Sequence, residues 1–371
     1  MLKATFVGVF LALLAGIVVT PQPASANPLA GIAAISGGCA LTTTGGLKCW
    51  GLNTYGRLGD GTLAPIRTTP VDVVGLTSGA AAVSEGGLHT CALTTAGGVK
   101  CWGYNSYGQL GDGTAVSSNT LVDVSGLASG VSAVSAGGQH TCAITTSGSL
   151  KCWGWNGHGQ LGDGQACGVV CTTPVDVVGL TSGAAAVSAG GLHTCALTTA
   201  GGVKCWGANG YGELGNGTSS GPELCENSAP PDCSTTPVDV VELTSVAVAV
   251  SAGGIHSTCA LTTEGGVKCW GYNAYGQLGD GQACGVVCTA PVDVAGLKPT
   301  PTATATPTPT PTPPPPVGGI SLDQSGGALP SAMQQSSPGA WLVAGVIAGV
   351  AAGAVALGSA VWYTQRRRLR R

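Results

Sequence analysis

Residues 39–62 read CALTTTGGLKCWGLNTYGRLGDGT, and residues 91–114 read CALTTAGGVKCWGYNSYGQLGDGT. Related stretches begin at Cys142, Cys195 and Cys259. The first cysteines of the five copies lie 52, 51, 53 and 64 residues apart. A period of this size is typical of supersecondary units that stack on one another, not of a single irregular globule.

Each copy contains four short extended stretches separated by glycine-rich turns. In the second copy these are residues 71–74, 81–84, 90–94 and 99–103. Four strands in a period of about 50 residues are typical of a propeller blade, so the chain is predicted to be an all-β propeller of five four-stranded blades. One tryptophan recurs in every copy, and its large ring is expected to pack one blade on the next: Trp50, Trp102, Trp153, Trp206 and Trp270.

The cysteines fall into local pairs. In the second copy, a tight turn at residues 95–97 brings Cys91 opposite Cys101 in a hairpin, at a separation that suits a disulfide. Zinc is the alternative, but it needs four converging ligands and these pairs lie in separate blades. The predicted disulfides are Cys39–Cys49, Cys91–Cys101, Cys142–Cys152, Cys167–Cys171, Cys195–Cys205, Cys225–Cys233, Cys259–Cys269 and Cys284–Cys288.

The segments H-T-C-A-L-T, V-K-C-W-G and G-Q-L-G-D-G-T resemble the regulator of chromosome condensation repeat over residues 32–297. The resemblance implies a propeller, usually of seven blades, that binds other macromolecules and is not an enzyme; this chain resembles a secreted, bacterial-type member with a C-terminal membrane anchor. Only five copies are present, and in the first Gly37-Gly38 runs directly into Cys39 without the His-Thr segment. The strand at 291–294 is predicted to close the ring by pairing with 32–36, and an open arc is the alternative.

Repeated polar residues are expected to serve the fold. His89, His140, His193 and His256 recur once per blade, and each is expected to bond a turn carbonyl, a metal ring being the alternative. A lysine before each tryptophan and an aspartate in each P-V-D-V strand suggest one ion pair per blade, and aspartates in the G-D-G turns should bond their own backbone. No Walker loop, Ser-His-Asp grouping, zinc-protease motif or calcium loop is present, so we predict no catalysis and no cofactor.

Three insertions break the symmetry between the G-D-G turn and the P-V-D-V strand, at 167–171, 219–235 and 284–288. Equivalent positions in a propeller emerge on one rim, so the insertions should form one preorganised surface for a protein partner. The alternative is that the disulfides only order long loops that have no binding function. The candidate contacts are Val169, Val170, Glu223, Glu226, Asp232, Val286 and Val287.

A second hypothesis is a glycan- or envelope-binding module that acts through one aromatic ring per W-G-x-N-x-x-G loop, and a purely structural surface protein is a third. The candidate rings are Tyr55, Tyr107, Trp155, Tyr211 and Tyr275. Residues 27–298 carry eight Lys or Arg against sixteen Asp or Glu, which disfavours nucleic acid as a partner.

The two ends predict a single-pass membrane protein with its N-terminal domain outside. Residues 1–26 have the pattern of a signal peptide, 27–298 form the propeller domain, and 299–317 are a Pro/Thr-rich linker. A spacer at 318–339 leads to an apolar span at 340–363 and a basic tail at 364–371, which should remain in the cytoplasm. Within the span, small residues could pair two helices into a homodimer, at Gly345, Gly349 and Gly353.

Overall fold

The computed structural model describes residues 31–164, 168–223, 225, 232–243, 246–254, 256–281 and 284–297. The predicted signal peptide, linker, spacer, apolar span and basic tail lie outside the described residues, as do Cys167, Glu226 and the three glycines of the span. Over the described ranges, no helix has the length and apolar character needed to cross a membrane.

Twenty strands form five four-stranded antiparallel sheets, which we number as blades 1 to 5 in chain order. Blades 1 and 2 contain β1 (Ile32–Ser36), β2 (Cys39–Thr42), β3 (Leu47–Leu52), β4 (Ile66–Asp72), β5 (Ala80–Glu85), β6 (His89–Thr94), β7 (Val99–Gly103) and β8 (Ser118–Asp123). Blade 3 contains β9 (Val131–Ala136), β10 (His140–Thr145), β11 (Leu150–Trp155) and β12 (Val170–Asp176). Blades 4 and 5 contain β13 (Ala184–Ala189), β14 (His193–Thr198), β15 (Val203–Ala208), β16 (Cys233–Asp239), β17 (Ala247–Ala252), β18 (Ser257–Thr262), β19 (Val267–Tyr272) and β20 (Val287–Asp293).

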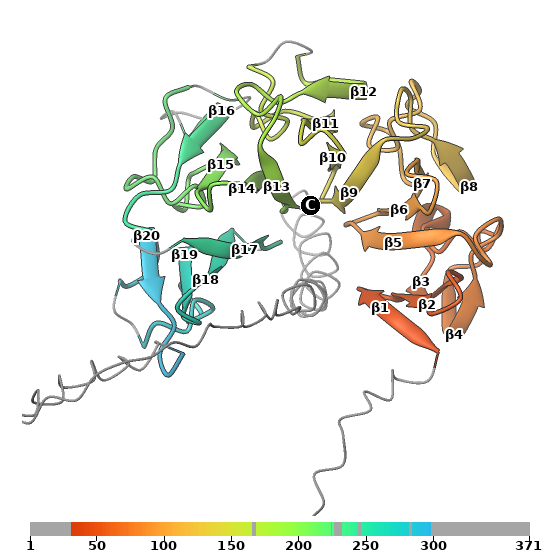
Figure 1. The fold of residues 1–371 in the computed structure, drawn as a ribbon, viewed down its shortest axis with the longest axis horizontal. Coiled ribbons are helices and arrows are strands. Elements are labelled where there is room, and N and C mark those ends of the chain that lie inside the picture. The colour runs from red at the N-terminus through yellow and green to blue at the C-terminus, as the bar shows by residue number, and fades with distance from the viewer. Residues whose placement is uncertain are drawn as a thin grey trace, which may run out of the picture.

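The five sheets surround a common centre, with the first strand of each blade innermost and the fourth outermost (Figure 1). This confirms the predicted all-β propeller of five four-stranded blades. The predicted closure is wrong, because β20 pairs with β19 and β1 with β2, and no pairing joins β20 to β1 in the described sheets. The described blades therefore form an arc, the alternative that the sequence left open.

The closure was mispredicted because each P-V-D-V strand belongs to the blade whose hairpin precedes it. After β3 the chain turns back through η1 (Thr54–Gly56) and a loop, and β4 pairs antiparallel with β3. The register places Lys48 opposite Asp72 and Cys49 opposite Val71. The strand at 291–294 is thus already used as the outer strand of blade 5.

The hairpin between the second and third strands carries the repeated disulfide. In blade 2 the turn is closed by Thr94 N–H to the Gly98 carbonyl, with Gly97 in the left-handed region at φ 79°. Cys91 then lies opposite Cys101, with Cα atoms 4.1 Å apart. The other four hairpins have the same bond.

Tryptophans fill the junctions between blades. Trp102, Trp153, Trp206 and Trp270 are fully buried against the preceding blade, as predicted. The tryptophan contacts the first glycine of the G-D-G loop in the preceding blade, and this position has no room for a side chain. In blade 3, a Cβ on Gly162, where φ is 70°, would lie 2.6 Å from Trp206 Nε1. Trp50 belongs to the first of the described blades and is only half-buried.

The predicted lysine–aspartate pair is present in every blade. The Nζ–Oδ1 distances are 2.5–2.8 Å in the five pairs Lys48–Asp72, Lys100–Asp123, Lys151–Asp176, Lys204–Asp239 and Lys268–Asp293. Because most of these side chains are substantially exposed to water, each pair contributes about 0–1 kcal/mol.

Candidate functional site

The loops between the third and fourth strands of the blades share one set of internal hydrogen bonds, made by an asparagine at the start of each loop; we call this set the frame. In blade 1, Asn53 Oδ1 accepts the Leu58 N–H at 3.0 Å, and Asn53 Nδ2 donates to Asp60 Oδ1 at 3.3 Å. Asp60 also accepts the Thr62 N–H, so the predicted local backbone bond of the G-D-G turn is present. We call the edge formed by these five loops the loop rim; its described residues are 53–65, 104–117, 156–164, 168–169, 209–223, 225, 232, 273–281 and 284–286.

The three insertions emerge at one position of that frame. The frame asparagine of blade 3, Asn156, donates its backbone N–H to the Val169 carbonyl at 2.7 Å. Asn209 donates in the same way to Asp232 at 2.6 Å, and Asn273 to Val286 at 2.7 Å. The insertions therefore lie on the same rim of three neighbouring blades, as the repeat predicts.

The predicted apolar contacts differ in their exposure. Val169, Val170 and Val286 are 44%, 38% and 60% exposed, whereas Val287 is half-buried at the start of β20. Glu223 forms an isolated bridge with Cys233. Its carboxylate accepts the Thr235 N–H, so it braces the insertion as well as carrying charge.

Two insertion disulfides fall within the described residues, Cys225–Cys233 and Cys284–Cys288. Asp280 lies close to the second of these, and its carboxylate and the two sulfurs are within 4.8 Å of one another. Zinc binds thiolates, and sulfurs joined in a disulfide are not thiolates, so this group is not a zinc site in the oxidised protein.

Aromatic rings on the loop rim, together with Trp155 at the end of β11, form a row across blades 1 to 3. Tyr55 contacts Tyr104 of the next blade, with ring centroids 4.5 Å apart, and Tyr107 contacts Trp155 at 6.0 Å. Tyr104 and Tyr107 connect these pairs, with ring centroids 6.1 Å apart, and His158 extends the row from Trp155 at 5.3 Å. The row joins three of the predicted glycan contacts.

The row is interrupted in blade 4 because Ala208 occupies the position that Tyr104 and Trp155 hold in their blades. A second group, which we call the end cluster, follows in blades 4 and 5 and consists of Tyr211, His256, Tyr272 and Tyr275. Tyr211 contacts His256 at 4.7 Å and Tyr272 at 4.8 Å, and Tyr272 contacts Tyr275 at 6.0 Å. The five predicted rings thus belong to two separate groups.

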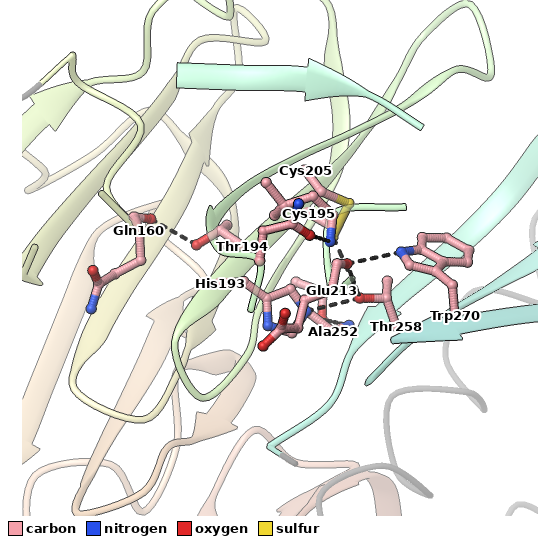
Figure 2. Close-up of a disulfide and its surroundings, with 12 residues drawn as sticks. Gln160, His193, Thr194, Cys195, Cys205, Glu213, Ala252, Thr258 and Trp270 are labelled. Atoms are coloured by element: carbon pink, nitrogen blue, oxygen red, sulfur yellow. Dashed lines mark hydrogen bonds between the residues drawn. A yellow bond between two sulfur atoms is a disulfide. The ribbon is translucent and has the colours of Figure 1, made fainter. Parts of the chain in front are cut away.

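Three of the repeated histidines connect neighbouring blades. His193 Nε2 lies 2.8 Å from the Thr258 hydroxyl, which donates to the Glu213 carbonyl together with the Trp270 indole N–H (Figure 2). Because the hydroxyl proton is used in that bond, the hydroxyl accepts from His193 Nε2–H. The same arrangement joins His89 to Thr141 and His140 to Thr194. The prediction of a turn carbonyl as the partner was wrong: the partner is a threonine of the next blade.

Burial keeps these histidines neutral. Burial lowers the pKa of His89 and His140 to about 3, with smaller contributions from Arg57 and from neighbouring histidines respectively. Burial also lowers the pKa of His193 to about 4, although the nearby Glu213 carboxylate opposes the shift. Each is a fixed hydrogen-bond donor at neutral pH.

The first junction uses charged groups. Blade 1 has no histidine, and a Cβ on Gly37 would collide with the Glu85 side chain, which fills the space. The Glu85 carboxylate forms an ion pair with Arg57 and accepts the Gly38 N–H. Arg57 Nη1 also donates to the Gly87 carbonyl at 2.7 Å.

His256 does not occupy the position of the other three histidines, contrary to the prediction. Blade 5 has one additional residue before its first cysteine, so Ser257 lies opposite Gly271 where His89 lies opposite Gly103. His256 is displaced into the turn at φ 50°, where its Nδ1 lies 2.6 Å from Glu213 Oε1.

Glu213 stands where blades 2 and 3 have Gln109 and Gln160. It is fully buried, which raises the pKa of its carboxyl group, but the hydrogen bond from His256 and smaller electrostatic interactions with His256 and His193 outweigh burial and leave that pKa below its ordinary value. Sequence reasoning missed this His–Glu pair. Two signals could have found it: the extra residue before Cys259 and the glutamate in a glutamine position.

Comparison with known proteins agrees with this geometry. The pattern described as "Regulator of chromosome condensation (RCC1) repeat" matches residues 45–93, 96–144, 147–197 and 200–260. A second RCC1 repeat pattern matches 81–109, 131–160, 184–213 and 247–277.

Among curated proteins, the Arabidopsis thaliana RCC1 domain-containing protein RUG3, mitochondrial, is 37% identical over 64% of this chain and 52% of its own length. The Arabidopsis ultraviolet-B receptor UVR8 is 29% identical over 70% of this chain and 58% of its length. The human E3 ubiquitin-protein ligase HERC2 is 30% identical over 67% of this chain, but the match covers only 5% of that protein. The chain thus spans slightly more than half of the first two relatives.

Among solved structures, Saccharomyces cerevisiae Prp20p, described with its binding to Gsp1p and histones, superposes with a TM-score of 0.59 at 22% identity, over 72% of this chain and 61% of Prp20p. Human WBSCR16 superposes with a TM-score of 0.56 at 24% identity, over 69% of this chain and 64% of WBSCR16. These likenesses support the propeller fold. With repeat matches over more than half of its length, this chain belongs to the regulator of chromosome condensation (RCC1) repeat family.

Proposed function

We propose that this chain is a membrane-tethered extracytoplasmic scaffold that binds a protein partner through the three insertions of its loop rim. The proposal rests on one observation: three successive blades carry an insertion at the same frame position, each fixed by a backbone bond from the frame asparagine. Loops of fixed conformation lose little entropy on binding, and exposed valines in two of the insertions, Val169, Val170 and Val286, provide apolar contact area.

The family comparisons support a binding role in general terms. Propellers of this family include Prp20p, a structure of which is described with Kap60 bound and another with binding to Gsp1p and histones. HERC2 is named as a ligase, but the match covers only 5% of it. We therefore assign binding, and not catalysis, to the propeller.

The test compares the full-length oxidised chain with a loop-trimmed variant in which each insertion is replaced by the blade 2 connection, residues 113–117. That connection has no disulfide and supports a blade of the same fold, so the variant should retain its fold. We expect chemical cross-linking in intact cells to capture a partner with the native chain and not with the variant. Equal capture by both would refute the role of the insertions.

The proposed tether has its own test. With residues 1–26 removed as a signal and 340–363 spanning the membrane, the propeller lies outside and the arginine-rich tail inside. Protease added to intact cells should degrade the repeats and spare an epitope placed after Arg371. Protection of the repeats would contradict the proposed orientation.

A glycan- or envelope-binding module is the second candidate, and the aromatic row of blades 1 to 3 favours it. The row provides neighbouring rings that extend without a gap from Tyr55 to His158. Substituting Tyr104 and Trp155 by alanine should abolish binding to cell-envelope polysaccharide if this candidate is correct. The same double variant should leave capture of a protein by the insertions unchanged.

A further inference from the structure

The end cluster combines exposed rings with a buried carboxylate that accepts hydrogen bonds from two of its residues. Tyr211 and Tyr275 are 41% and 85% exposed, and the Tyr211 ring lies between those of His256 and Tyr272. Glu213, whose side chain is 1% exposed, accepts from the Tyr211 backbone N–H at 2.8 Å and from His256 Nδ1 at 2.6 Å. Ring faces carry partial negative charge, and a carboxylate held out of water adds a negative potential that solvent screens weakly.

Within the described ranges, no lysine or arginine is left without a carboxylate partner to balance this surface. All seven Lys and Arg side chains of the described ranges are in ion pairs, which join Lys48, Lys100, Lys151, Lys204 and Lys268 to strand aspartates, Arg57 to Glu85 and Arg67 to Asp60. The neighbouring insertion adds Asp232, whose carbonyl accepts the Asn209 N–H at 2.6 Å, two residues before Tyr211. The imidazole of His256 is the one basic group in the end cluster.

His256 connects the buried carboxylate to the rings. Its Nδ1–H donates to Glu213 Oε1 at 2.6 Å, and its ring centroid lies 4.7 Å from that of Tyr211. Its backbone is left-handed at φ 50°, an uncommon conformation for a residue with a side chain, and such conformations cluster at functional sites. Two departures from the repeat, the additional residue in blade 5 and the glutamate at 213, are both needed to build this arrangement.

We propose that the end cluster binds an arginine or lysine side chain of a basic protein segment, with the cation against the exposed rings of Tyr211 and Tyr275 and attracted by the buried Glu213 carboxylate. Aromatic faces attract such cations, and arginine stacks best because its planar guanidinium is weakly hydrated. The inference rests on the proposed function and specifies the chemistry of its partner. An anionic segment would face Glu213 and Asp232 and is disfavoured.

The experiment measures binding of two synthetic peptides to the full-length chain by calorimetry. One peptide contains two arginines in a glycine–serine sequence, and the other has glutamines in their place. We expect only the arginine peptide to bind. Tyr211→Ala should weaken binding roughly five-fold, the effect of losing one exposed cation–π contact.

Two further variants separate a local role from a structural one. Glu213→Gln introduces the residue that blades 2 and 3 already carry, and it keeps the backbone carbonyl that accepts the Trp270 indole N–H. The variant should therefore fold normally and still bind the arginine peptide more weakly. Tyr107→Ala removes the equivalent ring, which lies two residues before neutral Gln109, and should leave binding unchanged. Equal binding of both peptides, or equal losses in Tyr107→Ala and Tyr211→Ala, would overturn the inference.

The outcome is distinguishable from that of the loop-trimming experiment. If the insertions are needed for partner capture but the arginine peptide does not bind, the proposed function stands and this inference falls. If the arginine peptide binds and the loop-trimmed variant still captures the partner, the end cluster remains a cation site and the insertions lose their assigned role.

Discussion

At the junctions between blades 2 and 3, 3 and 4, and 4 and 5, a neutral histidine of one blade donates to a threonine of the next. At the junction between blades 1 and 2, the ion pair of Arg57 and Glu85 fills the corresponding space. At all four junctions, one backbone carbonyl of the earlier blade accepts a hydrogen bond from the tryptophan indole N–H of the later blade. The tryptophan–carbonyl hydrogen bond is thus the same at every junction, whereas the other side chains between the blades can be neutral or charged.

The largest expected effect that separates the two kinds of junction is their response to acid. The pKa of His89, His140 and His193 is lowered in the folded chain to about 3, about 3 and about 4, so the unfolded chain binds protons below pH 6.5 that the folded chain does not. Stability is therefore lost as the pH falls below 6.5, by up to ~1.4 kcal/mol per pH unit for each histidine.

Urea unfolding of the oxidised chain between pH 7 and pH 5 measures this slope. Replacing one of the three, as in His140→Gln, should reduce the slope by about one third. A slope that is unchanged by the substitution would show that the neutral histidines do not cause it.

The second effect tests whether the tryptophans stabilise junctions or single blades. Trp206→Ala removes a fully buried ring and should lower the free energy of unfolding by ~3–5 kcal/mol. Trp50→Ala removes a half-buried ring of the first described blade and should cost clearly less. Thermal unfolding of the two variants measures the difference, and equal losses would mean that the ring acts within its own blade.

The smallest effect concerns the charged junction. Glu85→Gln leaves Arg57, whose side chain is 13% exposed, beside a neutral amide, and should lower stability by ~1–3 kcal/mol. Lys100→Gln, which breaks an exposed pair, is the control and should cost less than ~1 kcal/mol. Urea unfolding at neutral pH distinguishes the two, and equal small losses would show that the junction does not depend on its charge.

Much of the fold follows from the sequence because the repeat is local. The opposition of Cys91 and Cys101 needs only a hairpin, and the pairing of Lys100 with Asp123 needs only the register of adjacent strands. Strand pattern alone does not determine to which neighbouring blade a P-V-D-V strand belongs, which is why the closure was mispredicted. His256 was misplaced because a one-residue insertion hardly changes the motif but moves the side chain from the junction to the rim.

The hairpin disulfides have a mechanical consequence. Every disulfide within the described residues links two parts of one blade, so the blade junctions have no covalent restraint there. A chain stretched from its two ends would therefore yield at the junctions and lengthen in steps, one blade at a time. Each hairpin disulfide would withhold a segment of 10 residues from extension, about 35 Å of contour length.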